Sequence, residues 1–131
     1  MADQVAFAGP EWVAQLTEAF ADLPDQAGAT AVVEHTATGG PDGQVVYWTS
    51  FEDGRLVAAG TGRHADPTVT MTSPYTLAAH LATGGVDPSV AFMQGRTKVA
   101  GDQAALLRVL SVMATPAYRA AAARIADHTA I

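Results

Sequence analysis

Apolar and polar residues alternate over short stretches of this 131-residue chain, and the clearest alternation lies between residues 44 and 62. Asp53-Gly54 divides that stretch, and Asp-Gly is the dipeptide that a two-residue type I′ turn prefers. The pattern therefore predicts a β-hairpin. If no bulge intervenes, counting outward from the turn pairs Trp48 with Ala59.

Three further stretches have the alternation or the β-branched residues that are typical of strands, namely residues 29–36, 68–72 and 96–100. In the first of these, Val32 and Val33 are both apolar, so the pattern leaves the buried face undecided. His35 shares the face of Val33, because side chains two residues apart in a strand point the same way. The glycine-rich residues 39–43 predict a loop before the hairpin.

Helices are predicted at the start of the chain and throughout its C-terminal half. The first opens at Gly9-Pro10 and closes at Pro24, and its apolar stripe is Trp12, Val13, Leu16, Phe20 and Leu23. Each later helix follows a residue that can cap it, and these starts are Ser73-Pro74, Asp87-Pro88, Asp102 and Thr115-Pro116. Gly84-Gly85 and Gly95 supply ends for the first two of them.

The last predicted helix differs from the others because its apolar stripe is mostly alanine. Tyr118, Ala121, Ala122 and Ile125 form the stripe. Alanine favours the helix itself, but its methyl group buries little apolar area against a neighbour. We therefore expect this helix to detach at low cost and to control access to any pocket beneath it.

Composition indicates one domain spanning residues 1–131 and excludes several functional classes. The chain has seven basic and thirteen acidic residues, a net charge of −6 and no Lys/Arg cluster, so we expect no nucleic-acid partner. No apolar run approaches the roughly 20 residues of a membrane span, and residues 1–10 lack the features of a secretory signal. We expect a cytoplasmic protein without stable membrane insertion. One lysine against six arginines, with abundant alanine and glycine, suggests a GC-rich bacterial source.

No residue pattern predicts a catalytic group, a metal site or a cofactor. The chain has no cysteine. Its four histidines do not stand at metal-ligand spacing with a second ligand on one face, except that His64 and Asp66 flank a loop. The sequence contains neither a Gly-x-Ser-x-Gly elbow nor a phosphate-binding glycine loop.

The residues from Ala91 to Asp102 read AFMQGRTKVAGD, in which an aromatic-bearing helix leads through a glycine into a lysine-containing strand and a Gly-Asp helix start. This run resembles the signature of the sterol carrier protein 2 (SCP2) sterol-binding domain family, and the chain looks like a bacterial stand-alone member. The resemblance implies an α+β fold, in which a mixed five-stranded β-sheet is covered by about five α-helices and encloses an apolar tunnel.

The resemblance further implies a non-catalytic carrier of an apolar small molecule, such as a lipid, sterol, fatty acyl or polyketide-like ligand. Long and soft apolar side chains would line its tunnel, and the amide of Gln94 would orient one polar end of the ligand. The candidate ligand-binding residues are Trp48, Phe51, Met71, Leu77, Leu81, Phe92, Met93, Gln94, Leu106, Val109, Leu110 and Met113.

Two features depart from the eukaryotic members of that family, and two alternatives stay open. Residues 127–131 carry no peroxisomal tripeptide, and the acidity of the chain differs from the basic surface of those members. One alternative is an accessory enzyme of bacterial lipid or polyketide metabolism, with His35 or His64 pointing into the pocket. The other is a protein–protein interaction module with a flat apolar patch. We expect a monomer or a weak homodimer.

Overall fold

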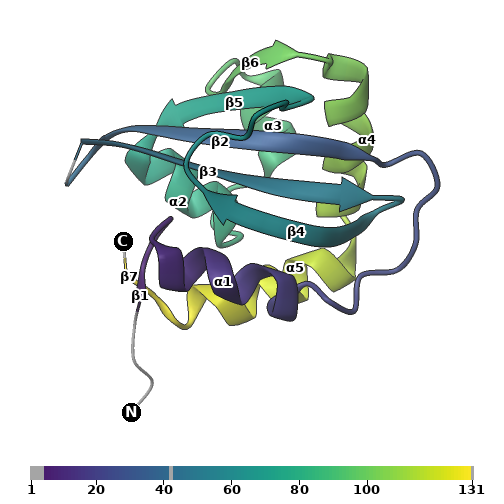
Figure 1. The fold of residues 1–131 in the computed structure, drawn as a ribbon, viewed down its shortest axis with the longest axis horizontal. Coiled ribbons are helices and arrows are strands. Elements are labelled where there is room, and N and C mark those ends of the chain that lie inside the picture. The colour runs from purple at the N-terminus through teal and green to yellow at the C-terminus, as the bar shows by residue number, and fades with distance from the viewer. Residues whose placement is uncertain (1–4, 42, 131) are drawn as a thin grey trace.

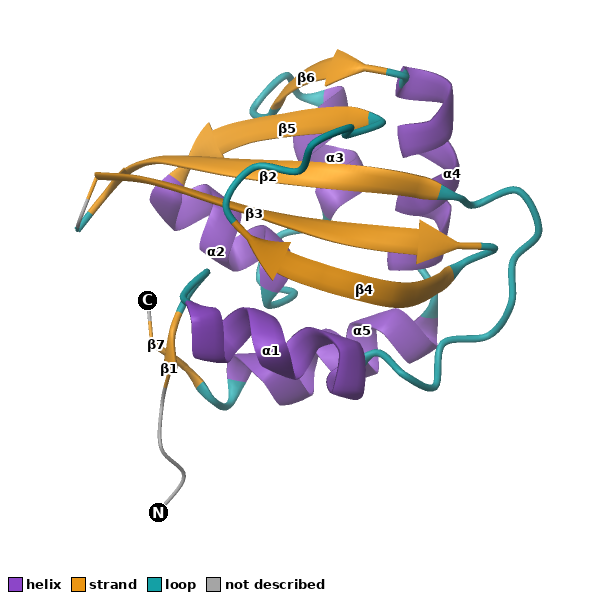
Figure 2. Ribbon diagram, in the orientation of Figure 1, coloured by secondary structure: helices purple, strands orange, loops and turns teal. Residues whose placement is uncertain are grey.

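The chain folds around a five-stranded β-sheet that carries helices on one of its faces (Figures 1 and 2). The computed structural model describes residues 5–41 and 43–130. The strands of this sheet are β2 (Ala31–Gly40), β3 (Gly43–Glu52), β4 (Arg55–Thr61), β5 (Val69–Pro74) and β6 (Lys98–Gly101). The helices are α1 (Pro10–Ala19), α2 (Tyr75–Ala82), α3 (Pro88–Met93), α4 (Gln103–Met113) and α5 (Pro116–Ala126). A separate two-stranded pair joins β1 (Val5–Ala6) to β7 (Thr129–Ala130).

The sheet is mixed, with the strand order β4-β3-β2-β5-β6. Its central pair, β2 and β5, is parallel, and the other neighbours are antiparallel. Residues 62–68 connect β4 to β5 across the face opposite the helices, while α1 and α5 lie side by side below the β4 edge in Figure 1. These observations confirm the predicted α+β class, with a mixed five-stranded sheet and five helices.

The predicted hairpin is present, but its register was wrong beyond the pairs nearest the turn. A β-bulge leaves Val57 without a partner, so Trp48 faces Gly60 instead of Ala59. A Cβ atom on Gly60 would lie 2.6 Å from the indole of Trp48. The bulge therefore places Gly60, the glycine of β4, against the indole ring, where a larger residue would not fit. Counting from the turn assumed an unbulged ladder and could not detect this shift.

The predicted loop at residues 39–43 was wrong in extent, because most of it belongs to strands. Gly39 and Gly40 end β2, while Gly43 opens β3 and pairs with Gly40. Gly39 and Gly43 have positive φ angles of 70° and 93°, which glycine adopts without steric cost. The chain therefore reverses within a tight hairpin. Asp42, which also falls in the predicted loop, lies outside the described residues.

Three of the four predicted later helix starts are confirmed by side-chain caps. Asp87 accepts a hydrogen bond from the Ser89 N–H at 2.8 Å, Asp102 accepts one from Ala105 at 3.0 Å, and Thr115 accepts one from Tyr118 at 3.3 Å.

The prediction that Ser73 caps α2 was wrong. Ser73 still belongs to β5 and is buried, and its hydroxyl lies 3.0 Å from that of Thr97. Pro74 stands at the N-cap position of α2 and makes no side-chain cap. A buried hydroxyl partner therefore holds Ser73 in the strand.

The first and last segments of the described chain, β1 and β7, pair with each other. Helix α1 ends at Ala19, earlier than predicted, although Phe20 and Leu23 beyond it are still buried. Strand β1 pairs in parallel with β7, and the indole N–H of Trp12 donates a hydrogen bond to the Thr129 hydroxyl at 3.0 Å. The residues that follow α5 are thereby tied to the start of α1.

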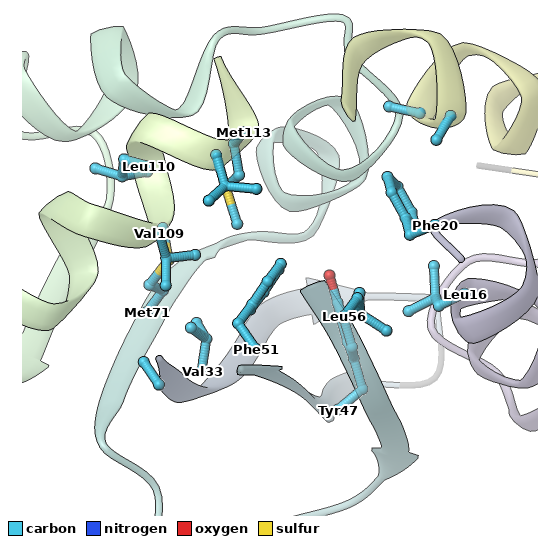
Figure 3. Close-up of a cluster of buried hydrophobic side chains, with 14 of the residues drawn as sticks. Leu16, Phe20, Val33, Tyr47, Phe51, Leu56, Met71, Val109, Leu110 and Met113 are labelled. Carbon is cyan, nitrogen blue, oxygen red and sulfur yellow. The ribbon is translucent and has the colours of Figure 1, made fainter. Parts of the chain in front are cut away.

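The core lies between the inner face of the sheet and the helices. Figure 3 shows Val33 and Phe51 pointing from the strands toward Val109 and Met113 of α4, with Leu16 approaching from α1. Phe51 and Val109 are among the largest fully buried side chains. The candidate site occupies the end of this core nearest to α1 and α5.

Candidate functional site

A small cavity of about 40 Å³ lies between the inner face of the sheet and helices α1, α2, α4 and α5. Most of its wall is apolar, with Leu16 from α1, Phe20 just beyond the end of α1, and Met71 from β5. Both strands of the β3–β4 hairpin contribute as well, because Tyr47 and Leu56 share the face that points toward the helices. We call this space the inner cavity.

A surface groove of about 330 Å³ leads toward the inner cavity from outside. It lies between α5 and the loop that follows α2, and its walls include Val86 and Ala122. Leu81, Met113 and Tyr118 border both the groove and the inner cavity. These three side chains, which we call the partition, are therefore what separates the two spaces.

A third space of about 20 Å³ adjoins the inner cavity on its sheet side. His35, Tyr47, Met71 and Leu81 border both spaces. The groove, the inner cavity and this deep pocket thus form a row that runs from the surface to the inner face of the sheet. The row marks a path, although side chains interrupt it in this conformation.

His35 brings a polar ring into the apolar wall of the inner cavity. Its Nε2 atom lies 3.1 Å from the Thr49 hydroxyl, and its ring stacks on Tyr47 with a centroid distance of 4.5 Å and an interplanar angle of 10°. Burial away from bulk water lowers the pKa of His35 from 6.5 to about 4, because an apolar setting disfavours the charged ring. His35 is therefore neutral at pH 7.

Two tyrosines also border the inner cavity. Burial raises the pKa of both Tyr47 and Tyr118, and their proximity raises that of Tyr47 further. Figure 3 shows the Tyr47 hydroxyl pointing away from the sheet toward the helices. Tyr118 packs against Phe20, with a centroid distance of 4.6 Å. Both phenols therefore stay protonated and can donate as well as accept hydrogen bonds.

Charged side chains are absent from the wall of the inner cavity, as far as residues 5–41 and 43–130 show. Within the same residues, no group of three potential metal ligands occurs, and no helix is long and apolar enough to cross a bilayer. A histidine without a neighbouring carboxylate lacks the partner that usually orients it for proton transfer. The wall of the inner cavity thus offers apolar contacts and a few hydrogen-bonding groups.

The structure brings some of the twelve predicted ligand-binding residues together and scatters others. Met71, Leu81 and Met113 border the inner cavity. Five more are buried, and Phe92 is partly buried against the core; Phe51, Leu106, Val109 and Leu110 belong to that core, and the fifth buried residue is Leu77. The part that these residues play in binding stays a prediction.

Trp48, Met93 and Gln94 border neither the inner cavity nor its two neighbours. Met93 is 84% exposed, and Gln94, whose amide the family resemblance places at one polar end of the ligand, is exposed as well. Trp48 lies on the outer face of the sheet, where its ring meets His64 edge-on at 4.8 Å. His64 belongs to the connection formed by residues 62–68, which also covers Glu34. The carboxylate of Glu34 accepts a hydrogen bond from the backbone N–H of His64 at 2.9 Å. His64 therefore serves the outer face and not the cavity.

The sequence prediction missed several residues of the cavity wall, although signals for some of them existed. His35 shares the face of Val33, which is fully buried, so its inward direction followed once that face was known. Tyr118 belongs to the apolar stripe of the last helix. Leu16 and Phe20 belong to the stripe of the first. No signal indicated where the stripes would leave space between them.

Comparison with known sequences identifies one matching family. The sequence profile of the SCP-2 sterol transfer family matches residues 14–114, a range that contains all five strands of the main sheet and three complete helices. None of the curated proteins matches the chain significantly.

Several solved structures share the fold. The crystal structure of sterol carrier protein 2 has a TM-score of 0.66 and 12% identity, covering 95% of this chain and 99% of that chain. A conserved hypothetical protein of Thermus thermophilus, described as possibly a sterol carrier protein, has a TM-score of 0.64 and 14% identity, covering 95% of each chain. Palmitated SCP2L2 from Aedes aegypti has a TM-score of 0.59 and 15% identity, covering 80% of this chain and 89% of that chain. At these identities the likeness shows the fold alone.

Proposed function

The chain belongs to the SCP-2 sterol transfer family, and from that premise we propose that it is a non-catalytic carrier of an apolar small molecule. Lipids, sterols, fatty acyl chains and polyketide-like molecules are the ligand classes that fit this proposal. The observation that carries it is the row of spaces from the surface groove through the inner cavity to the sheet. The palmitate of the Aedes aegypti protein adds support from a protein of the same fold.

The proposed mechanism is desolvation, in which the carrier replaces water around the ligand with apolar wall atoms. Pockets for small molecules usually enclose about 300–1,000 Å³, so the inner cavity of about 40 Å³ must expand to hold such a ligand. The groove of about 330 Å³ already reaches that range. Movement of the partition would join the two spaces. Met71 and the buried residues Phe51, Leu106 and Leu110 would then contact the ligand.

The alternative of an accessory enzyme draws on one observation, that His35 borders the inner cavity. The ring's hydrogen-bond partner there is the Thr49 hydroxyl, and no described carboxylate borders the same space. Acid–base or nucleophilic catalysis by histidine normally needs a partner that orients and activates it. An interaction module would need a flat apolar patch in place of a cavity. We therefore favour binding over both alternatives.

A direct test looks for the ligand itself. Native mass spectrometry of the protein purified from its own host should show a mass above that of the chain, and extraction with organic solvent should release an apolar molecule. If the protein carries no adduct and also takes up none of a panel of fatty acids, sterols and alcohols, the proposal is wrong.

A second test blocks the proposed path at the partition. Leu81→Trp should lower the affinity for a fluorescent fatty acyl probe by at least about tenfold, because the larger ring fills the junction between groove and cavity. Leu107→Trp is the matched control, since Leu107 is 55% exposed on α4. Leu81→Ala should instead speed uptake. Circular dichroism checks that each variant is folded, and wild-type uptake by both Leu81 variants would contradict the proposed path.

A further inference from the structure

The inner cavity contains more hydrogen-bonding capacity than its protein neighbours use. Every fully enclosed side-chain nitrogen or oxygen of the described residues has a hydrogen-bond partner. The side-chain hydrogen bonds of those residues include one to the His35 ring, at Nε2, and none to the hydroxyls of Tyr47 or Tyr118. Because no fully enclosed polar side-chain atom of the described residues lacks a partner, these two hydroxyls are each reached by a water-sized probe, and they can bond to a group that enters the cavity beside them.

From this we propose that His35, Tyr47 and Tyr118 form a polar end of the binding site, which selects apolar ligands that bury one neutral hydroxyl or carbonyl group there. The inference rests on the proposed carrier function and specifies the class of ligand. The three side chains come from β2, β3 and α5, so the sheet and the last helix both contribute to the same end.

The donors and acceptors of these groups suit a neutral group whichever tautomer His35 adopts. If Thr49 donates to Nε2, the proton of the ring is on Nδ1, which becomes a donor. If Nε2 donates to Thr49, Nδ1 becomes an acceptor. Each phenol can both donate and accept. An alcohol, which also does both, or a ketone or ester, which accepts, can therefore be satisfied at this end.

A charged head group does not suit the same place. Among the described residues, no Lys or Arg borders the inner cavity, and His35 is neutral at pH 7 because burial lowers its pKa to about 4. An unpaired carboxylate in an apolar site would lose its hydration without gaining a counter-ion. The charged residues near the path lie in the groove, where Arg119 pairs with Asp87 at 3.2 Å. A charged group would therefore stay in the groove while the tail of the ligand entered.

The test compares three ligands of one chain length, decane, 1-decanol and decanoate, by competition with a fluorescent fatty acyl probe. Tyr47→Phe, Tyr118→Phe and His35→Leu should each weaken 1-decanol binding by about 3- to 10-fold, the usual value of one hydrogen bond to a neutral group, and decane binding by less than about twofold. Comparing variants with one ligand at a time cancels the different solubilities of the ligands. Tyr75→Phe is the matched control, because Tyr75 borders none of the three spaces in the row and should leave both affinities unchanged.

Distinct results would overturn this inference and the carrier function. If the wild-type protein binds none of the three ligands, both the carrier function and the polar end are wrong. If decane and 1-decanol both bind, but each of the three variants changes the two affinities by the same factor, the proposed polar end is wrong while the carrier function stands. If decanoate binds as tightly as 1-decanol, and Tyr47→Phe weakens its binding while Arg119→Gln does not, the charged head group enters the polar end and the inference is overturned.

Discussion

His35 is the residue whose setting departs most from its ordinary chemistry. It stands in the central strand β2 between Glu34 and Thr36, which point to the other face of the sheet, and it is half-buried because its ring borders the cavity. Desolvation lowers its pKa to about 4, and neither a carboxylate nor a metal ligand lies against its ring among the described residues. Neutrality therefore comes from the apolar surroundings.

Acidification should consequently destabilise the protein through His35. The unfolded chain takes up a proton on this ring below its usual pKa of 6.5, whereas the native ring stays neutral until about pH 4. The unfolded state thus binds more protons between these values, and stability falls as the pH falls from 6.5 to 4. The loss attributable to His35 reaches up to about 3 kcal/mol at the acid end.

Urea denaturation of the wild type and of His35→Gln at several pH values between 7 and 4 would measure this contribution. The carboxylates of the chain act on both proteins, so the difference between the two curves isolates the imidazole. The variant should lose less stability over the same range. Parallel curves would show that His35 does not titrate below its usual range in the native state.

At the scale of the elements, local sequence signals predicted where helices begin better than they predicted which residues pair between strands. Asp87, Asp102 and Thr115 cap helices as expected, because a cap depends only on residues within one turn. Ser73 has the same local pattern, but its hydroxyl bonds to Thr97, a residue 24 positions away. The bulge at Val57 likewise depends on how Trp48 packs across the hairpin. Contacts between distant residues of this kind cannot be predicted from the sequence of a single helix or strand.

The hairpin register makes a separate prediction about Gly60. Gly60→Ala should destabilise the fold by about 1–3 kcal/mol, because the new Cβ would meet the Trp48 ring at 2.6 Å. In a Trp48→Leu background the same change should cost clearly less, so a double-mutant cycle measured by chemical denaturation should give a coupling of at least about 0.5 kcal/mol. The unbulged register places Gly60 opposite Tyr47, so additive effects of the two changes would support that register.

At the scale of the whole molecule, the sequence predicted the architecture but not the shape of the site. The run from Ala91 to Asp102 has the order of elements found in the structure, so the sheet and its helices could be predicted. The cavity depends on small gaps left where Leu81, Met113 and Tyr118 meet, and these side chains come from three different helices. Their meeting is decided by the packing of the whole core. Met93 and Gln94 lie inside the signature and yet are exposed.

The row of spaces can become one site only if part of the molecule opens, and α5, which borders both the groove and the inner cavity, buries smaller side chains than α4 does. Ala121 and Ala122 make up most of its buried face, whereas α4 buries larger side chains such as Leu106 and Met113. At about 25 cal/mol per Å² of apolar surface, the methyl groups contribute much less. The Thr115 cap holds the start of α5, and the Trp12–Thr129 hydrogen bond holds the residues beyond its end.

Amide hydrogen exchange should reveal this opening, because local unfolding exposes amides at a lower free energy than global unfolding does. Amides from Tyr118 to Ala126 should exchange before those from Leu106 to Met113, and saturating 1-decanol should slow the first group more than the second. Thr129→Ala should speed exchange in α5 further, because it removes the hydroxyl that accepts the Trp12 hydrogen bond, whereas Thr61→Ala, at an exposed position of β4, should not. Equal protection of α4 and α5, with and without ligand, would mean that α5 is fixed scaffold and that the path opens at another place.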